Sequence, residues 1–182
     1  NQRRMIDESP AGAEFKAALR GKLDALLALA EATDCRRVRL LAYFDEPSEP
    51  CGNCDNCISP PAVWDATDAA RKLLSTIYRV QQASGITFGA GHLMDVLRGK
   101  ATDKVAQFGH DKLSTFGLGA DLSEHQLRGV LRQLVATGAV GLEKVHLDNG
   151  HSFETLALTD ASRSVLRGEV PVRLRETVAA AP

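Results

Sequence analysis

Four cysteines, all before residue 58, constrain the fold of this chain more than any other feature of its sequence. They are Cys35, Cys51, Cys54 and Cys57. Two Cys-x-x-Cys spacings share Cys54, and this arrangement lets several sulfurs converge on one ion. The surrounding segment, residues 46–61, is rich in Pro, Gly, Asn, Asp and Ser and has no apolar periodicity, so metal binding is the predicted source of its order.

The ligand set favours zinc in a structural role. Four sulfur ligands suit the tetrahedral geometry of Zn²⁺ and leave no open position for a reactive water. In a reducing cytosol thiols stay available as ligands, so a metal site is preferred to disulfides. Two alternatives stay open, an iron–sulfur cluster and unpaired or redox-active cysteines. We expect one structural Zn²⁺.

Composition fits a globular protein of one or two domains and shows no overall preference for an anionic partner. The chain has 182 residues, 44% of them hydrophobic, a formal net charge of -1 and an aromatic content of 5%. Any nucleic-acid contact must therefore come from a local basic patch. No apolar run is long enough to span a bilayer, and residues 1–7 carry charge where a signal peptide would be apolar. We expect a cytosolic protein with no membrane contact.

Helical periodicity dominates the first part of the chain. Apolar residues recur at spacings of three and four between residues 14 and 33, which predicts an amphipathic helix. A second helix is predicted over residues 35–44, with Asp34 as its N-cap. The dipeptide Pro60-Pro61 resists continuation of a helix or a sheet and marks a domain boundary.

We therefore predict three regions. Residues 1–61 form a helical hairpin and zinc-binding module, residues 62–170 form a second domain, and residues 171–182 form a flexible tail. The fold class is mostly α with a small β-hairpin.

The second region has the element order of a winged helix. Apolar periodicity predicts helices over residues 68–83, 92–97, 103–113, 124–137 and 160–167. After Gly138 the period changes to two, which predicts a hairpin of residues 140–147 and 152–158 around Asp148-Asn149-Gly150. Helices followed directly by a hairpin indicate a helix-turn-helix relative with a β-hairpin wing.

Basic residues in the second region are the candidate DNA contacts. Those placed to meet phosphates beside a recognition helix are Arg98, Lys100, Lys104, Lys112, Arg128 and Arg132. The alternative is an ordinary solvated helix face, which the pattern alone favours, because residues 65–170 carry 12 Lys or Arg against 12 Asp or Glu.

Histidines give a weaker indication of function. His146 and His151 flank the hairpin turn and could reach a base pair or a phosphate, with exposed turn residues as the alternative. His92, His110 and His125 have no cysteine or carboxylate cluster beside them in sequence, so core or surface positions are preferred to metal ligation. The sequence has no glycine-rich phosphate loop with its lysine and no general base beside a cysteine, so no catalytic residue is expected.

Several motifs resemble the C-terminal region of bacterial RecQ DNA helicases. The zinc-binding module of that family is resembled by residues 35–37 (CRR), 41–44 (LAYF) and 51–57 (CGNCDNC). Its winged-helix part, the RQC region, is resembled by residues 109–113 (GHDKL) and 131–134 (LRQL). Residues 3–7 (RRMID) are similar to the segment that leaves the second RecA-like motor domain.

The resemblance implies zinc ligation by the four cysteines and duplex binding by the winged helix. The recognition helix would lie around residues 123–132 and the wing around residues 148–150. The wing tip lacks the large aromatic residue expected of a strand-separating wedge, so the recognition helix is the safer DNA contact. The residues implied as DNA contacts are Arg98, Lys100, Lys104, His110, Lys112, Ser123, His125, Arg128, Arg132, His146 and His151.

The resemblance also implies a parent enzyme with ATP-dependent 3'-to-5' unwinding activity. Its motor domains, with ATP and Mg²⁺, would lie upstream, and little chain would remain for a downstream HRDC domain, so this fragment alone would not be an enzyme. Expected roles are DNA repair, recombination, replication and the SOS response, in a bacterial cytoplasm at the nucleoid. Expected partners are duplex or forked DNA and single-strand-binding protein, with the chain as a monomer. Two other functions stay open, a protein-interaction module and a redox or iron–sulfur sensor.

Overall fold

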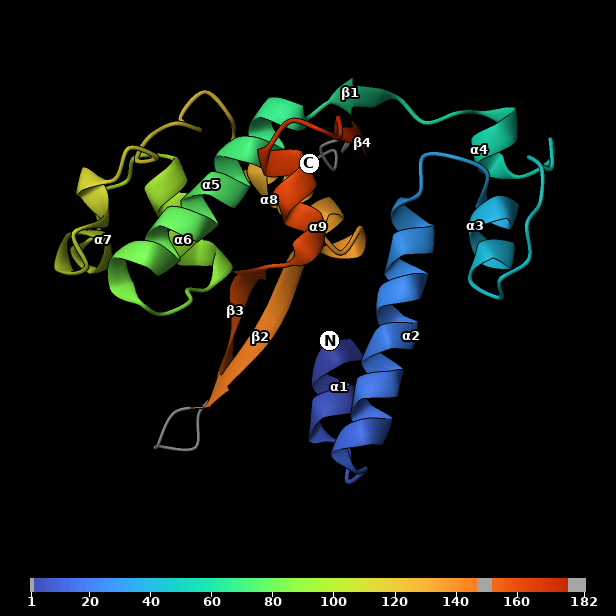
Figure 1. Cartoon of the computed structure of the whole chain (residues 1–182), viewed down its shortest axis with the longest axis horizontal. Helices are drawn as coiled ribbons and strands as arrows, with labels where there is room; N and C mark the ends of the chain where they lie inside the picture. Colours follow the sequence, from blue (N-terminus) through green and yellow to red (C-terminus); the bar gives the residue numbers. More distant parts are fainter. Residues whose placement is uncertain (1, 147–151, 177–182) are drawn as a thin grey trace, which may run out of the picture. The chain divides into compact units, whose positions relative to one another are not determined.

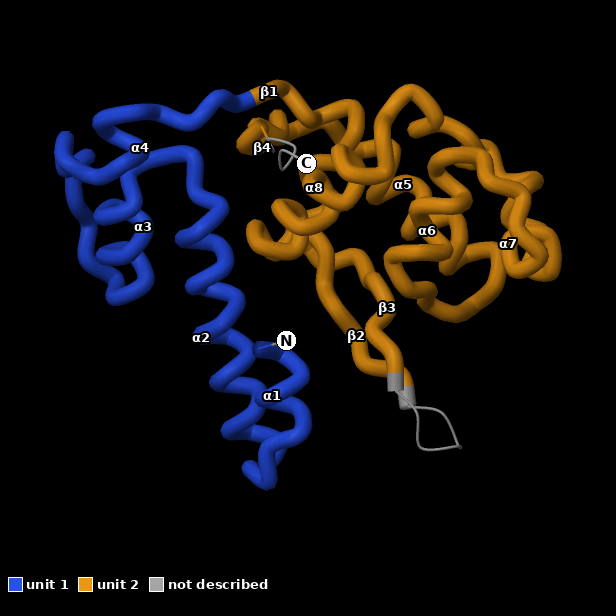
Figure 2. Tube along the Cα trace, turned by 180° about the vertical axis from the view of Figure 1, so that it is seen from behind, with its two compact units in different colours: residues 1–63 blue, residues 64–182 orange. Residues whose placement is uncertain are grey.

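The chain folds into two compact units that meet between Val63 and Trp64 (Figures 1 and 2). The computed structural model describes residues 2–146 and 152–176. The boundary falls in the connecting segment that contains Pro60 and Pro61. Within the described ranges, no helix is both long enough and apolar enough to cross a membrane.

Unit 1, residues 1–63, is helical and has little core of its own. Its helices are α1 (Gln2–Glu8), α2 (Ala13–Glu31), α3 (Arg36–Ala42) and α4 (Asp55–Ile58). Helix α1 lies beside α2 (Figure 1), and the ion pair of Asp7 with Arg20 connects the two helices. Among the described residues of unit 1 only Ala32, Cys35 and Asn56 are buried. Apolar burial therefore cannot be the main source of order around the cysteines.

Unit 2, residues 64–182, contains most of the secondary structure. Its helical elements are α5 (Thr67–Ser84), α6 (Ala90–Leu97), α7 (Asp103–Gln107), the 3₁₀ helix η1 (His110–Lys112), α8 (Glu124–Ala136) and α9 (Asp160–Leu166). Its strands are β2 (Val140–His146), β3 (Ser152–Leu158) and β4 (Arg173–Arg175), and β1 (Val63–Asp65) begins at the boundary. The predicted helix over residues 103–113 is split into α7 and η1, because Gly109 takes a left-handed conformation with φ of 67°.

One hydrophobic core holds unit 2 together. Helix α5 contributes Leu73, Leu74 and Ile77, all at most 1% exposed, and they pack in one cluster with Leu93 of α6 and Leu127 of α8. Full burial of each leucine or isoleucine side chain contributes roughly 1.5–3 kcal/mol. The periodicity of the sequence predicts this core, because the buried residues of α5 recur at three and four.

The hairpin β2–β3 is joined to this core at its base. The antiparallel register pairs Val140 with Leu158 and Leu142 with Leu156. A third backbone segment pairs with β3 where the N–H of Leu156 donates to the carbonyl of Phe88 at 3.0 Å. Helices followed by a hairpin with this extra pairing form a winged helix, which confirms the predicted fold class.

The expected flexible tail from residue 171 is wrong for residues 171–176. Strand β4 pairs with β1, and Leu174 is 3% exposed. The side chain of Gln133 donates to the carbonyl of Arg175 and accepts from its N–H, both at 2.9 Å. A three-residue strand is too short to show periodicity, so the sequence conceals it. Residues 177–182 of that prediction lie outside the described residues.

Candidate metal centre and nucleic-acid interface

The four cysteine sulfurs converge on one point in unit 1. Cys35 is the residue immediately before α3, and the other three cysteines lie in the loop that leads into and through α4. All four Sγ atoms lie within 4.8 Å of one another. The Sγ atom of Cys35 is 3.5 Å from that of Cys51 and 4.0 Å from that of Cys54.

This geometry fits a tetrahedral zinc ion. With Zn–S bonds of about 2.3 Å, the sulfurs of a regular tetrahedron lie about 3.8 Å apart. The distances of 3.5 Å and 4.0 Å from Cys35 fall on either side of that value. Four thiolates close the coordination sphere, so the ion would have a structural role.

Backbone amides prepare two of the thiols for metal binding. The N–H of Cys51 donates to the Cys35 sulfur at 3.3 Å and is the main reason why the pKa of the Cys35 thiol falls to about 6. The backbone of Arg36 lowers the pKa of the Cys54 thiol. The hydrogen bond with Cys54 raises the pKa of the Cys57 thiol to about 11, because a proton is retained among the crowded sulfurs. A bound divalent cation offsets the repulsion between neighbouring thiolates and keeps these ligands deprotonated.

Two polar side chains connect the cysteine loop to the end of α2. Arg36 forms a bidentate ion pair with the carboxylate of Asp55, with N···O distances of 2.7 and 2.9 Å. Its Nη1 also donates to the carbonyl of Leu29 at 2.6 Å. Asn56 is buried, and its Nδ2 donates to the carbonyls of Ala32 and Asp34 at 2.9 and 2.8 Å. These hydrogen bonds therefore help to position the cysteine loop against the end of α2.

The candidate nucleic-acid interface starts at the N-terminus of α8. A capping box fixes this end, because Ser123 Oγ accepts from the N–H of Gln126 at 3.2 Å and Gln126 Oε1 accepts from the N–H of Ser123 at 2.9 Å. The free N–H groups of a helix N-terminus carry partial positive charge and attract anions. Of the predicted contacts, Ser123, His125 and Arg128 are exposed on this first part of α8.

Three of the predicted basic residues meet at this helix end. Arg98 Nη1 and Lys100 Nζ lie 3.1 and 3.5 Å from Glu124 Oε2, and Arg128 Nη2 lies 2.8 Å from Glu124 Oε1. Lys100 also lies 3.5 Å from Asp95. We call Arg98, Lys100 and Arg128 the cation cluster. The cations were predicted from the sequence, but the carboxylates among them were not, although the four-residue spacing of Glu124 and Arg128 is a recognised helix ion-pair signal.

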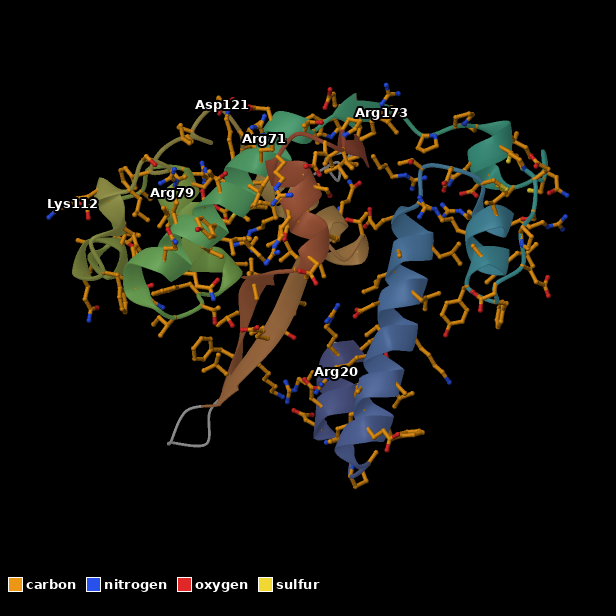
Figure 3. The ribbon with its side chains drawn as sticks, viewed as in Figure 1. Arg20, Arg71, Arg79, Lys112, Asp121 and Arg173 are labelled. Atoms are coloured by element: carbon orange, nitrogen blue, oxygen red, sulfur yellow. The ribbon has the colours of Figure 1, made fainter. Side chains whose placement is uncertain are left out.

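The other predicted basic residues lie outside this cluster. Lys104 is exposed on α7, with its Nζ 5.5 Å from the centre of the Phe88 ring. Lys112 is exposed at the end of η1, where Figure 3 shows it pointing outward. Arg132 is exposed on α8, four residues after Arg128.

The prediction that His110 contacts DNA is wrong, because its side chain is buried. His110 is 0% exposed, and its Nδ1 lies 2.7 Å from Nε2 of His92, so no nucleic acid can touch the ring in this fold. Within the GHDKL motif, His110 therefore belongs to the core, whereas Lys112 is exposed. The His146 side chain and all of His151 lie outside the described residues.

Three exposed side chains were not assigned from the sequence. Arg71 and Arg79 lie on α5, as Figure 3 shows, and no charged partner for either occurs among the described residues. Phe153 is 43% exposed on β3, opposite Val145 of β2. The wing contacts predicted from the sequence flank the hairpin turn and do not include this aromatic residue on the strand.

Both units of the chain match known protein families. Residues 1–58 match the RecQ zinc-binding family, and residues 60–182 match the RQC domain. The ATP-dependent DNA helicase RecQ of Haemophilus influenzae is 41% identical over 84% of this chain and 23% of its own length. The protein of the same name in Bacillus subtilis is 31% identical over 99% of this chain and 29% of its own length.

These matches define what the chain contains. It spans less than a third of the length of the relatives it matches. The zinc-binding match covers all four cysteines, which supports zinc as the metal for the site. The chain belongs to the RecQ helicase family, of which it carries the zinc-binding and RQC domains.

Proposed function

We propose that this chain is the zinc-binding and duplex DNA-binding region of a RecQ-type ATP-dependent DNA helicase. The observation that carries the proposal is the cation cluster at the N-terminus of α8. Arg98 and Lys100 follow α6, and Arg128 lies on α8, so the fold brings them to one helix end. This is the end at which a helix also attracts phosphate through its backbone.

The arrangement supports a specific mode of duplex binding. The N-terminal residues of a recognition helix approach the major groove, while the flanking cations contact the backbone phosphates. Ser123 and His125 would lie nearest to the bases and the cation cluster nearest to the phosphates. The wing of β2 and β3 would lie beside the duplex end, with exposed Phe153 as its described aromatic side chain.

Zinc binding would serve this function indirectly. Unit 1 has almost no apolar core, so a closed four-cysteine site would fix the loop of residues 46–61 and the start of α3. Zinc would thus keep the segment of the chain that precedes the winged helix folded.

The activity of the parent enzyme is part of the proposal. The relatives that share these domains are named ATP-dependent DNA helicases. We place ATP and Mg²⁺ binding in motor domains outside this chain and propose 3'-to-5' unwinding in bacterial DNA repair and recombination. This chain would act as a monomer in the cytoplasm and grip duplex or forked DNA, with single-strand-binding protein as a further partner.

The test compares two matched double variants of the zinc-loaded chain. Arg128→Ala with Arg132→Ala removes two cations four residues apart on α8. Arg163→Ala with Arg167→Ala removes two at the same spacing, on α9 and at its C-cap. Fluorescence anisotropy with a labelled duplex at about 50 mM salt should show at least a tenfold loss for the α8 variant. Equal affinities for the two variants would refute the proposed interface.

One observation favours a different function, a protein-interaction module. Among the described residues of unit 2, several large apolar side chains are exposed, including Tyr78 at 47%, Ile86 at 51% and Phe153 at 43%. Exposed apolar groups are typical of protein interfaces, although single ones are also common on ordinary surfaces. Binding to a protein partner that is unaffected by salt, with no binding to duplex DNA, would favour this function over ours.

A further inference from the structure

We propose that Glu124 is a built-in competitor of the DNA phosphate at the recognition helix. Its carboxylate occupies the cation cluster in the free protein, and a phosphate of the duplex displaces it on binding. The inference rests on the proposed duplex-binding function and adds to it a residue that limits DNA affinity.

The geometry of Glu124 is that of a bound anion held by several cations. Its Oε1 accepts from Nε and Nη2 of Arg128 at 3.0 and 2.8 Å. Its Oε2 lies 3.1 Å from Arg98 Nη1 and 3.5 Å from Lys100 Nζ. Both oxygens are thus used, and the cations come from two different parts of the fold, as in a phosphate site.

The helix does not require this carboxylate in order to begin. Ser123 and Gln126 form the capping box one residue before and two residues after Glu124. That box satisfies the backbone groups at the helix start without help from Glu124. The Glu124 side chain is therefore free to move away while α8 stays intact.

The contacts of Glu124 are weak enough to be exchanged. The Glu124 side chain is 40% exposed, and those of Arg98, Lys100 and Arg128 are 28%, 46% and 52% exposed. Exposed ion pairs contribute little net stability in water and are screened by salt. A duplex offers a row of phosphates and releases condensed counterions when cations replace them, so it can outcompete one carboxylate.

Charge balance explains why the competition limits affinity. Arg98, Lys100 and Arg128 carry three positive charges, and Asp95 and Glu124 carry two negative charges within the same group of ion pairs. The local net charge is therefore +1 in the free protein and becomes +2 when Glu124 is neutral. A single anion gains little from such a site, whereas a duplex that spans several cations gains enough to displace Glu124.

The test is the isosteric replacement Glu124→Gln, with Glu169→Gln as a control. Glu169 is an exposed glutamate in an ion pair with Arg167 just after α9, so the control makes the same change in total charge. Glu124→Gln should tighten duplex binding by about threefold to tenfold at about 50 mM salt and steepen its salt dependence, because the freed cations meet phosphate without competition. Glu169→Gln should change the affinity by less than about twofold.

A double variant shows whether the effect passes through the cation cluster. In a chain that already carries Arg128→Ala, Glu124→Gln should give a clearly smaller gain, because the strongest partner of the carboxylate is gone. Unchanged or weaker duplex binding by Glu124→Gln, or a gain equal to that of Glu169→Gln, would overturn the role of Glu124. That result is distinct from failure of the proposed function, in which the unaltered chain itself would show no salt-sensitive duplex binding.

Discussion

The Nε2 atom of His92 lies 2.7 Å from the Nδ1 atom of His110 in the core of unit 2. His92 is 7% exposed and stacks on Phe88 with ring centres 4.3 Å apart, and His110 is fully buried. One ring must donate its N–H and the other must accept, so the contact needs at least one neutral imidazole. Phe88 also pairs with β3, and this histidine pair therefore supports the base of the wing.

We predict that unit 2 loses stability as the pH falls below about 6.5. Burial, with the nearby charges of His110 and Lys104, lowers the pKa of His92 to about 4, and burial also lowers the pKa of His110. The unfolded chain then binds protons between about pH 6.5 and 4 that the folded chain does not, so the free energy of unfolding decreases through that window, by up to about 2–3 kcal/mol for His92.

Trp64 provides the measurement for this prediction. It is the only tryptophan of the chain and packs against the core of unit 2, so its fluorescence follows the unfolding of that unit. Urea midpoints should fall from pH 7 to pH 5, and the fall should be smaller in the variant His92→Gln. An identical fall in both proteins would show that His92 is not its source.

Removal of zinc should unfold part of unit 1 and leave unit 2 folded. The only buried residues described in unit 1 are Ala32, Cys35 and Asn56, whereas unit 2 has its own hydrophobic core. Chelation should expose the amides of residues 34–60 to hydrogen exchange, because structural zinc supplies folding free energy directly. The Trp64 urea midpoint at pH 7 should stay the same, and a large shift in it would contradict this division.

Replacement of Asn56 should weaken the metal site without touching a ligand. Its Nδ2 bonds to the carbonyls of Ala32 and Asp34, so Asn56→Ala leaves two acceptors without this donor. The cost should be about 1–3 kcal/mol, measured as weaker zinc binding in competition with a chelator. Asn53 is exposed in the same loop, and Asn53→Ala serves as the control with little expected effect. Equal zinc affinities would argue against the role of Asn56.

Leu174 should matter for stability although it lies close to the end of the sequence. It is 3% exposed in β4, so Leu174→Ala should lower the free energy of unfolding of unit 2 by about 2–4 kcal/mol. Val170 is 47% exposed a few residues earlier, and Val170→Ala should cost less than about 0.5 kcal/mol. If the two variants had the same urea midpoint, the packing of β4 would be refuted.

The elements that the sequence predicts well are those with strong periodicity. Helix α5 and helix α8 each bury one apolar face over several turns, and the hairpin alternates on both sides of its turn. Their boundaries depend on local capping, which is harder to predict. Asp68, for example, is of a residue type that often caps helix N-termini, but it lies inside α5 and forms an ion pair with Lys72. At the start of this helix, the carboxylate of Asp65 accepts a hydrogen bond from the N–H of Thr67.

The metal site was predictable because its chemistry depends on four residues close together in sequence. The nucleic-acid interface was less predictable than the metal site, because its charge and exposure depend on contacts between segments that are distant in sequence. Arg98 and Glu124 meet only after α6 and α8 are packed, and the burial of His110 depends on its contact with His92. A sequence shows the number of cations but not which carboxylates neutralise them.

The salt dependence of duplex binding by the zinc-loaded chain tests the central claim most directly. A cation cluster that replaces counterions on about three phosphates predicts a slope of about -2 to -3 for the logarithm of the association constant against the logarithm of salt concentration. Replacement of Arg128 by alanine should reduce that slope by about 1. A slope near zero, or no duplex binding at low salt, would contradict DNA binding through the N-terminus of α8.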